Sequence, residues 1–281
     1  MNPIAATTVH WIRGINLPLM AFALGYLGVH APALWVEFHA LRQDWVDDAR
    51  GRMIGFPGVT PHLSLASRPE NWVHDEGDST LLWAGWDRKA SKHHWFKLGK
   101  GDIDPADLTL AMGRDSIRPI DKPRLESRIG EIWKAMAPEE IVAVGEFQGI
   151  QLAYPLSILS KVLVVNDEVH TKPLLVVHNP FVEDVHAAEM INPLLDGTKK
   201  RTMGKAGYLW HGRPLLYDRE TQGLWAASHD GVKCLSGESK GKVLVRIAHL
   251  DPVNWGAWSS NHPAGRLVAG AIRDDWKNPK P

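Results

Sequence analysis

The sequence predicts an α+β fold: one N-terminal transmembrane helix, followed by a mainly antiparallel β soluble domain with a few short helices. Two observations carry this prediction. Residues 15–36 contain no Asp, Glu, Lys or Arg, and the stretch is about as long as the roughly 20 apolar residues that cross a bilayer as a helix. Downstream, short apolar runs alternate with Gly, Asp and Pro, which is typical of strands joined by tight turns.

The apolar segment has the features of a membrane anchor. Its apolar residues include Ile15, Leu19, Phe22 and Leu27. Trp35 stands at its far end, where interfacial aromatic side chains lie in membrane proteins. Membrane lipid is therefore the first expected partner. A cleavable signal peptide, a buried soluble helix and a helix lying in the interface remain alternatives.

The orientation of the anchor depends on few charges. Arg13 precedes it, whereas Arg42, Arg50 and Arg52 follow it. A count of Lys and Arg alone would place the C-terminal side inside the cell, because cytoplasmic flanks carry the excess of cations.

After the anchor the sequence divides into a Trp-rich connecting region and a larger domain. We expect the anchor over 1–37, the connecting region over 38–110 and the domain over 111–281. A helix is predicted over 37–52 and another over 125–137. Strands are predicted over 80–86, 94–98, 140–147, 149–154, 162–165, 173–177, 215–217 and 242–247.

Composition excludes some classes of function. The formal net charge is zero, which argues against nucleic-acid binding, since that needs surplus Lys and Arg. Thirteen tryptophans favour an interaction surface, because Trp collects at interfaces and headgroups. The single cysteine, Cys234, cannot form an intrachain disulfide and is interpreted as structural.

Four sequence blocks in the second half occur in a recognisable order. They are residues 113–124, residues 153–167 with Ala153-Tyr-Pro and Val165-Asn-Asp, residues 216–225 with Tyr-Asp-Arg-x-Thr, and Trp255-Gly-Ala-Trp258 with His262-Pro263. Over about residues 113–268 the chain resembles domain-of-unknown-function family 3179. The positions that match its blocks are Tyr154, Pro155, Asn166, Asp167, Tyr217, Asp218, Arg219, Trp225, Trp255 and Trp258.

The departures from this family are informative. The resemblance implies a His-Glu pair and a Cys-Pro-x-Cys motif, but Val162, Leu163 and Asn179-Pro-Phe-Val182 stand there. Valine can neither ligate a metal nor transfer a proton, and asparagine is a poor substitute for a thiolate. We therefore expect no catalytic residues and no cofactor, on a retained scaffold with a changed role.

Two alternatives stay open. A replacement metal site or enzyme site could use His178, Glu183, Asp184, His186 and Glu189, with the last two sharing a helix face. The sequence favours the simpler interpretation of this segment, a solvated turn and helix of mixed charge. A small-ligand module could use an apolar pocket lined by Val162, Leu163 and Val182, or these residues could fill the core. Tyr217-Asp218-Arg219 could form a polar site or order a turn.

The sequence therefore favours a non-catalytic, membrane-anchored accessory subunit that packs against other subunits of a larger membrane complex, of respiratory or photosynthetic type. Since family members resemble exported proteins, we expect the domain on the periplasmic side of a bacterial cytoplasmic (inner) membrane. Trp and Arg residues are frequent anchors of such interfaces.

Overall fold

The structure is a computed structural model that describes residues 68–87, 90–178 and 188–269. All of them belong to one compact unit. The expected anchor, with Ile15, Leu19, Phe22, Leu27 and Trp35, and the expected helix over 37–52 lie outside these residues. In the part of the chain that is described, no helix is long and apolar enough to span a membrane.

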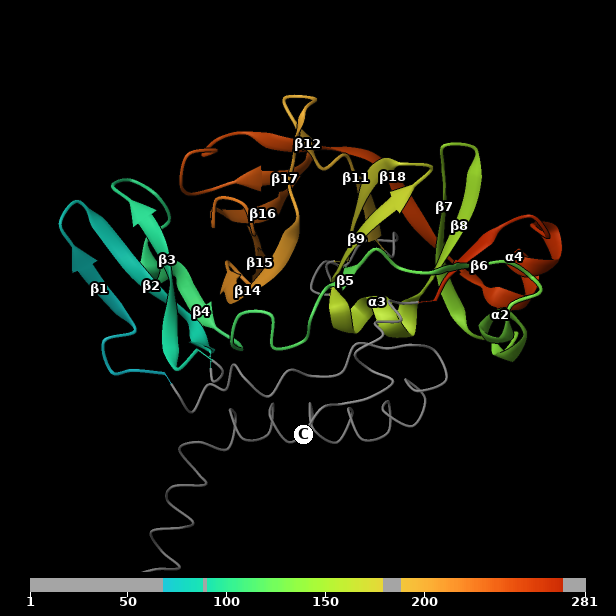
Figure 1. Cartoon of the computed structure of the whole chain (residues 1–281), viewed down its shortest axis with the longest axis horizontal. Coiled ribbons are helices and arrows are strands. Elements are labelled where there is room, and N and C mark those ends of the chain that lie inside the picture. The colour runs from blue at the N-terminus through green and yellow to red at the C-terminus, as the bar shows by residue number, and fades with distance from the viewer. Residues whose placement is uncertain (1–67, 88–89, 179–187, 270–281) are drawn as a thin grey trace, which may run out of the picture. The chain divides into compact units, whose positions relative to one another are not determined.

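The first folded element is a three-stranded antiparallel sheet in the order β1-β2-β3 (Figure 1). Its strands are β1 Val73–Glu76, β2 Ser79–Asp87 and β3 Lys92–Gly99. Leu82, Phe96 and Leu98 are buried, because the alternation of a strand sends every second side chain to one face. The strands predicted over 80–86 and 94–98 are confirmed.

A fourteen-stranded sheet forms the rest of the unit. Its path runs β4-β14-β15-β16-β17-β18-β11-β10-β9-β5, and β7, β8, β19 and β6 join it through β18. The bounds are β4 Leu108–Leu110, β5 Ile120–Asp121, β6 Leu125–Glu126, β7 Ile141–Phe147, β8 Ile150–Pro155, β9 Val164–Val169, β10 Lys172–Val177, β11 Ala188–Ile191, β14 Met203–Trp210, β15 Arg213–Asp218, β16 Leu224–Ser228, β17 Gly231–Cys234, β18 Val243–Asn254 and β19 Arg266–Val268. All pairs are antiparallel except β5 with β9 and β19 with β8.

Three short α-helices and one small hairpin complete the described residues. The helices are α2 Glu131–Ala135, α3 Leu156–Val162 and α4 Trp255–Asn261, and a 3₁₀ turn covers Pro105–Asp107. The hairpin consists of β12 Leu194–Leu195 and β13 Lys199–Lys200. The expected class, mainly antiparallel β with a few short helices, is confirmed for this part of the chain.

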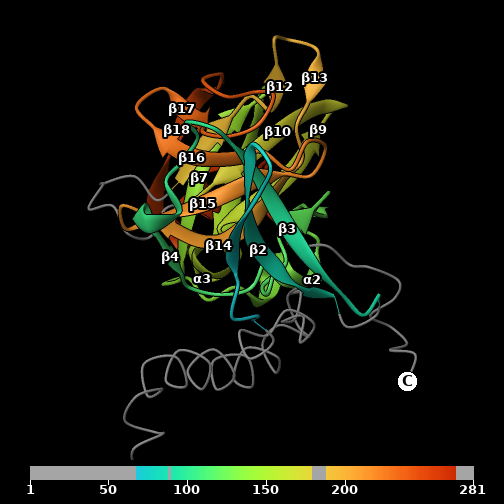
Figure 2. The same cartoon turned by 90° about the vertical axis from the view of Figure 1, so that its left-hand side faces the viewer.

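The large sheet curls until β9 meets β14, so that eight strands surround one core. Figures 1 and 2 show β14 to β17 as neighbours in one curved layer. The enclosed side chains come from all eight strands and from the segment after β11: Val164, Leu175, Val177, Ile191, Leu195, Met203, Leu216, Trp225, Val232, Cys234 and Leu244. Eight strands leave an interior that side chains can fill.

Further cores lie on the outer faces of this ring. Leu82, Ala84, Phe96 and Leu98 of the three-stranded sheet pack against Tyr208, Leu215, Tyr217 and Leu224 of β14 to β16. Strands β7 and β8 and helix α3 pack with β9, β10 and β11 around residues such as Leu152, Ile158 and Val176. The four-block region therefore has core on both faces of its main strands.

Two predicted elements were wrong in detail. The helix expected over 125–137 is reduced to α2, because residues 125–126 pair with β19 and Gly130 is the N-cap. The strand expected over 162–165 begins later, since Val162 ends α3 and Leu163 caps this helix in the left-handed conformation. The strands expected over 140–147, 149–154 and 173–177 are confirmed within one residue at each end.

Candidate functional site

The line where β9 meets β14, which we call the seam, gathers polar residues from several sequence blocks. Asn166 of β9 donates from Nδ2 to the Met203 carbonyl at 2.9 Å and accepts the Met203 amide at 2.8 Å. One side chain thus satisfies both backbone groups of a buried residue on β14. It replaces the ladder that two paired strands would otherwise form.

Asp121 connects the same seam to the end of β15. Its Oδ1 accepts from Asn166 Nδ2 at 2.8 Å, and its Oδ2 accepts from Arg219 at 2.6 Å. Burial alone would lower the pKa of Arg219, but the hydrogen bond and charge of Asp121 raise it above its ordinary value. The guanidinium of Arg219 therefore stays charged, and its bond to Asp121 holds β5 against the turn after β15.

Lys205 is the most unusual charge at the seam. It is 3% exposed, and its ammonium donates to the Lys161 carbonyl at 3.3 Å. Burial lowers the pKa of Lys205 to about 7, and the charge of Asp115 only partly opposes this effect. Asp115 also accepts the Lys205 amide at 2.7 Å and the Tyr217 hydroxyl at 2.5 Å.

The guanidinium of Arg114 extends this network towards the first sheet. It lies 4.8 Å from the ring centre of Tyr217 and 5.8 Å from that of Phe96, and it donates to Gln222 at 2.6 Å. Burial raises the pKa of Tyr217, and Asp115 raises it further, so this hydroxyl remains a hydrogen-bond donor. These contacts hold the ring of Tyr217 and the guanidinium of Arg114 in place.

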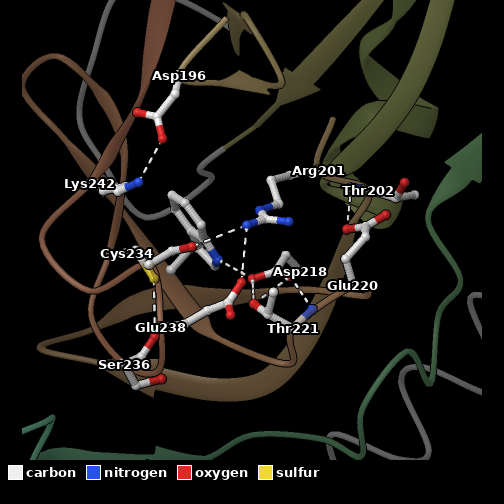
Figure 3. Close-up of polar contacts among 12 residues, drawn as sticks. Asp196, Arg201, Thr202, Asp218, Glu220, Thr221, Cys234, Ser236, Glu238 and Lys242 are labelled. Atoms are coloured by element: carbon white, nitrogen blue, oxygen red, sulfur yellow. Dashed lines mark hydrogen bonds and ion pairs between the residues drawn. The ribbon is translucent and has the colours of Figure 1, made fainter. Parts of the chain in front are cut away.

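Asp218 is fully buried and organises the turn after β15 (Figure 3). Its carboxylate accepts the Thr221 amide at 2.6 Å, the Thr221 hydroxyl at 2.7 Å and the Trp225 Nε1 proton at 2.8 Å. Three donors satisfy this buried carboxylate, so Asp218 orders the turn over residues 218–221. Beside it, Arg201 donates to Ser239 at 3.2 Å.

Cys234 is a structural residue, as expected. Its thiol is buried and donates to the Ser236 carbonyl at 3.1 Å (Figure 3). Burial raises the pKa of this thiol to about 11. It therefore stays protonated at neutral pH, and the thiolate that a nucleophile requires does not form.

The remaining block residues lie inside the fold, and the buried Nε1 of Trp258 has no hydrogen-bond partner among the described residues. Tyr154 donates to Asp167 at 3.0 Å, and burial raises the pKa of both groups. Pro155 is the N-cap residue of α3. Trp255 and Trp258 lie 4.6 and 5.8 Å from Trp133, measured between ring centres, and fill one core under α2 and α4.

A comparison with known protein families identifies the family in which these blocks occur. Residues 114–279 match the family described as "Protein of unknown function (DUF3179)". The chain belongs to DUF3179. No curated protein and no solved structure matches it.

Two of the positions at which the resemblance to DUF3179 implied reactive residues, 162 and 163, are occupied by packing groups. Val162 is fully buried in the core beneath α3, and Leu163 packs against the core of the ring. The His178 amide donates to the Leu163 carbonyl at 2.8 Å, which places the end of β10 beside the end of α3. Asn179 and Val182 lie outside the described residues, and Val162 and Leu163 contribute to core packing.

The replacement metal cluster is only partly visible in this DUF3179 chain. Glu183, Asp184 and His186 lie outside the described residues. Glu189 is on strand β11 and not on the expected helix, because β11 pairs with β10 and β18, and its carboxylate accepts from Arg246 at 2.8 Å. Among residues 68–87, 90–178 and 188–269, no three His, Cys, Asp or Glu side chains could hold a metal ion.

Sequence reasoning missed Lys205, Asp115, Asp121 and Arg114 as parts of one network. A signal was present for Lys205, since it is the single charge within Met203-Gly-Lys-Ala-Gly-Tyr-Leu-Trp210. A charge amid an apolar run either faces solvent or is buried with specific partners. The partners come from positions distant in sequence, so spacing alone could not find them.

Proposed function

We propose that this DUF3179 chain is a non-catalytic accessory subunit, anchored by residues 15–36 in the cytoplasmic membrane of a bacterium, with its folded domain in the periplasm. One observation carries the proposal. The polar residues of the family blocks use their hydrogen bonds inside the fold, as Asp218 does with Thr221 and Trp225 and Asn166 does with Met203. They stabilise a scaffold, which suits a protein that acts by binding.

A binding partner needs an apolar surface to contact, and strand β18 offers one. Val245 is 59% exposed and Ile247 is 45% exposed. They are two residues apart on one strand, and Ile247 is the extra residue of a β-bulge opposite Met190 and Ile191, a feature that redirects side chains locally. Exposed β-branched side chains on the central strand of a sheet contribute area to an interface with another subunit.

Gentle detergent extraction of the native membrane, followed by native gel electrophoresis and mass spectrometry, tests the proposal. Co-migration with a defined set of membrane subunits supports an accessory role. A Val245→Glu, Ile247→Glu variant should then lose this co-migration, because a charge in an apolar contact costs about 2 kcal/mol or more. The matched control is Ile129→Glu, since Ile129 is 77% exposed elsewhere.

Two results would count against the proposal. The first is extraction of the wild-type chain only as a free monomer. The second is an equal effect of the β18 variant and of the Ile129 control, because a general loss of solubility would then explain both.

A further inference from the structure

Arg201 is a buried cation whose hydrogen-bond donors are not all used. It follows directly after β13, and its side chain is 7% exposed. One terminal nitrogen of its guanidinium donates to the Ser239 hydroxyl at 3.2 Å. Its Nε is buried and has no hydrogen-bond partner among the described residues. Because a buried N–H without an acceptor costs free energy, this place favours a group that brings oxygen atoms to the guanidinium.

One carboxylate faces Arg201 but satisfies it poorly. The Oε1 of Glu238 lies 3.6 Å from the Nη2 of Arg201, which is too far for a hydrogen bond. Figure 3 shows the two side chains pointing towards one another. Glu238 is 67% exposed, and an exposed ion pair of this kind contributes little to stability. The carboxylate therefore covers the guanidinium and is free to turn away into water.

The loop between β17 and β18 carries both Glu238 and Ser239, and other groups hold it in place. Asp102 accepts the Gly237 amide at 3.3 Å and pairs with the ammonium of Lys240 at 2.9 Å. Ser239 is only 3% exposed. The loop thus presents the Ser239 hydroxyl at a fixed position beside the guanidinium, while the side chain of Glu238 remains movable.

Lysine side chains add positive charge to the same region. Lys242 donates to Asp196, on the turn of the β12–β13 hairpin, at 2.6 Å. This hydrogen bond lowers the pKa of Asp196, and the charges of Lys242, Lys199 and Arg201 lower it further. Lys242 and Arg201 therefore act on one place. Both members of the Lys242–Asp196 pair are exposed, so the ammonium is free to turn to another anion.

The other carboxylates drawn beside Arg201 in Figure 3 already have donors of their own. Asp218 accepts hydrogen bonds within its own turn and from a tryptophan, and Glu220 accepts a backbone amide at 2.9 Å. Within the part of the chain that the structure describes, Glu238 alone forms an ion pair with Arg201. An incoming anion therefore competes with a single exposed carboxylate for this guanidinium.

We propose that Arg201, Ser239 and Lys242 form a binding site for a phosphate group, and that this phosphate displaces Glu238. A phosphate group has several oxygen atoms in different directions, which suits a guanidinium, a hydroxyl and an ammonium that approach from different elements. The site lies outside the four sequence blocks, on the β12–β13 hairpin and the β17–β18 loop. It requires neither the membrane anchor nor the accessory role of the proposed function.

Isothermal titration calorimetry of the full-length chain in a non-ionic detergent tests this site. Inorganic phosphate is the probe, added near neutral pH at constant ionic strength, with chloride as the reference anion. We expect saturable binding of phosphate at one site per chain. Glu238→Gln should tighten this binding about fivefold, because it removes a like charge beside the ligand. Arg201→Lys should weaken it about tenfold, because lysine keeps the charge but lacks the planar fork of donors.

The matched control is Glu139→Gln, since Glu139 is an exposed glutamate in the loop before β7. Its phosphate affinity should equal that of the wild type. Glu238→Gln changes only an exposed side chain, so it tests the site even if Arg201→Lys does not fold. A Glu238→Gln variant that binds no phosphate, or one that binds it no more tightly than Glu139→Gln, would overturn the inference. A folded Arg201→Lys variant with unchanged affinity would also overturn it, because the phosphate would then bind elsewhere.

Two phosphate esters distinguish the sources of the ligand. Glycerol 3-phosphate presents the group on a soluble molecule, and short-chain phosphatidic acid presents it on a lipid. Tighter binding of the first would support a soluble phosphomonoester as the ligand, and tighter binding of the second would support a lipid headgroup. Binding of inorganic phosphate without binding of either ester would mean an adventitious ion only, and the inference would fail. Co-migration with membrane subunits is measured separately, so this failure would leave the proposed accessory role intact.

Discussion

Replacing the buried Lys205 by methionine should stabilise the protein near neutral pH. Burial lowers the pKa of this lysine from 10.5 to about 7. At about 1.4 kcal/mol per pH unit, the difference is about 5 kcal/mol of unfavourable free energy when an unfolded, protonated lysine is buried at about pH 7. Methionine has a similar length and no charge.

Two losses reduce the net gain. The hydrogen bond to the Lys161 carbonyl is worth about 1 kcal/mol, and repacking around a new side chain costs about 1 kcal/mol. The expected increase in the free energy of unfolding is therefore about 2–3 kcal/mol near pH 7, obtained from these three terms.

The pH dependence of the free energy of unfolding tests the effect of Lys205 more sharply than its value at one pH. Between about pH 7 and pH 10.5 the unfolded chain binds a proton at Lys205 that the native chain does not bind. Stability of the wild-type protein therefore rises with pH across this window through this residue, because the slope follows the difference in bound protons. The advantage of Lys205→Met should shrink with rising pH and vanish near about pH 9.

Urea unfolding in a mild detergent, followed by tryptophan fluorescence, measures this difference at several pH values. Lys233→Met is the control, because Lys233 is an exposed lysine on β17 and should change stability by less than about 0.5 kcal/mol. A variant at Lys205 that is less stable than the wild type at pH 7, or a difference independent of pH, would refute the reasoning.

Three further changes test the architecture through thermal unfolding of the full chain. Gly207→Ala should lower the free energy of unfolding by about 2–4 kcal/mol or prevent folding, because Gly207 has φ of +88° and an added Cβ would lie 2.2 Å from the Met112 carbonyl oxygen. An unchanged midpoint of thermal unfolding would contradict this close approach. Asp218→Asn should lower the free energy of unfolding by about 2–3 kcal/mol, because an amide cannot accept hydrogen bonds from all the donors to Asp218, which include Trp225. A loss of stability below about 0.5 kcal/mol would mean that the turn does not depend on the carboxylate. Asn166→Ala should lower the free energy of unfolding by about 2–4 kcal/mol, because it leaves the buried Met203 amide and carbonyl unpaired. Asn166→Asp can accept from the Met203 amide but cannot donate to its carbonyl, so a return of stability in this variant would show that only the first hydrogen bond matters.

The sequence predicted local elements well and their assembly poorly. The hairpin of β7 and β8 follows from alternating apolar residues around Gln148-Gly149, whose φ angles of 54° and 74° suit a tight turn. The helix expected over 125–137 failed, because residues 125–126 pair with β19, whose strand lies more than a hundred residues downstream. Local propensity is weak when distant strands compete for the same backbone.

The seam shows a different limit. Asn166 and Met203 are 37 residues apart, and no periodicity connects an asparagine side chain with a particular backbone pair on another strand. The block Val165-Asn-Asp167 indicated that these residues matter, but not what they do. Only the closure of the ring shows that Asn166 acts in place of a strand pair.

This role changes what the family blocks indicate about function. Asn166, Asp218 and Tyr154 are needed wherever the ring must close, turn and pack, so a chain can retain them with or without reactive chemistry. Positions 162 and 163 are not required in this way, since Val162 serves as core and Leu163 as a helix cap. In this chain the two positions therefore contribute to packing and leave the ring-closing contacts of Asn166 unchanged. For this reason the retained blocks support a common scaffold, and the exposed residues Val245 and Ile247 of β18 are the place to look for what this particular chain binds.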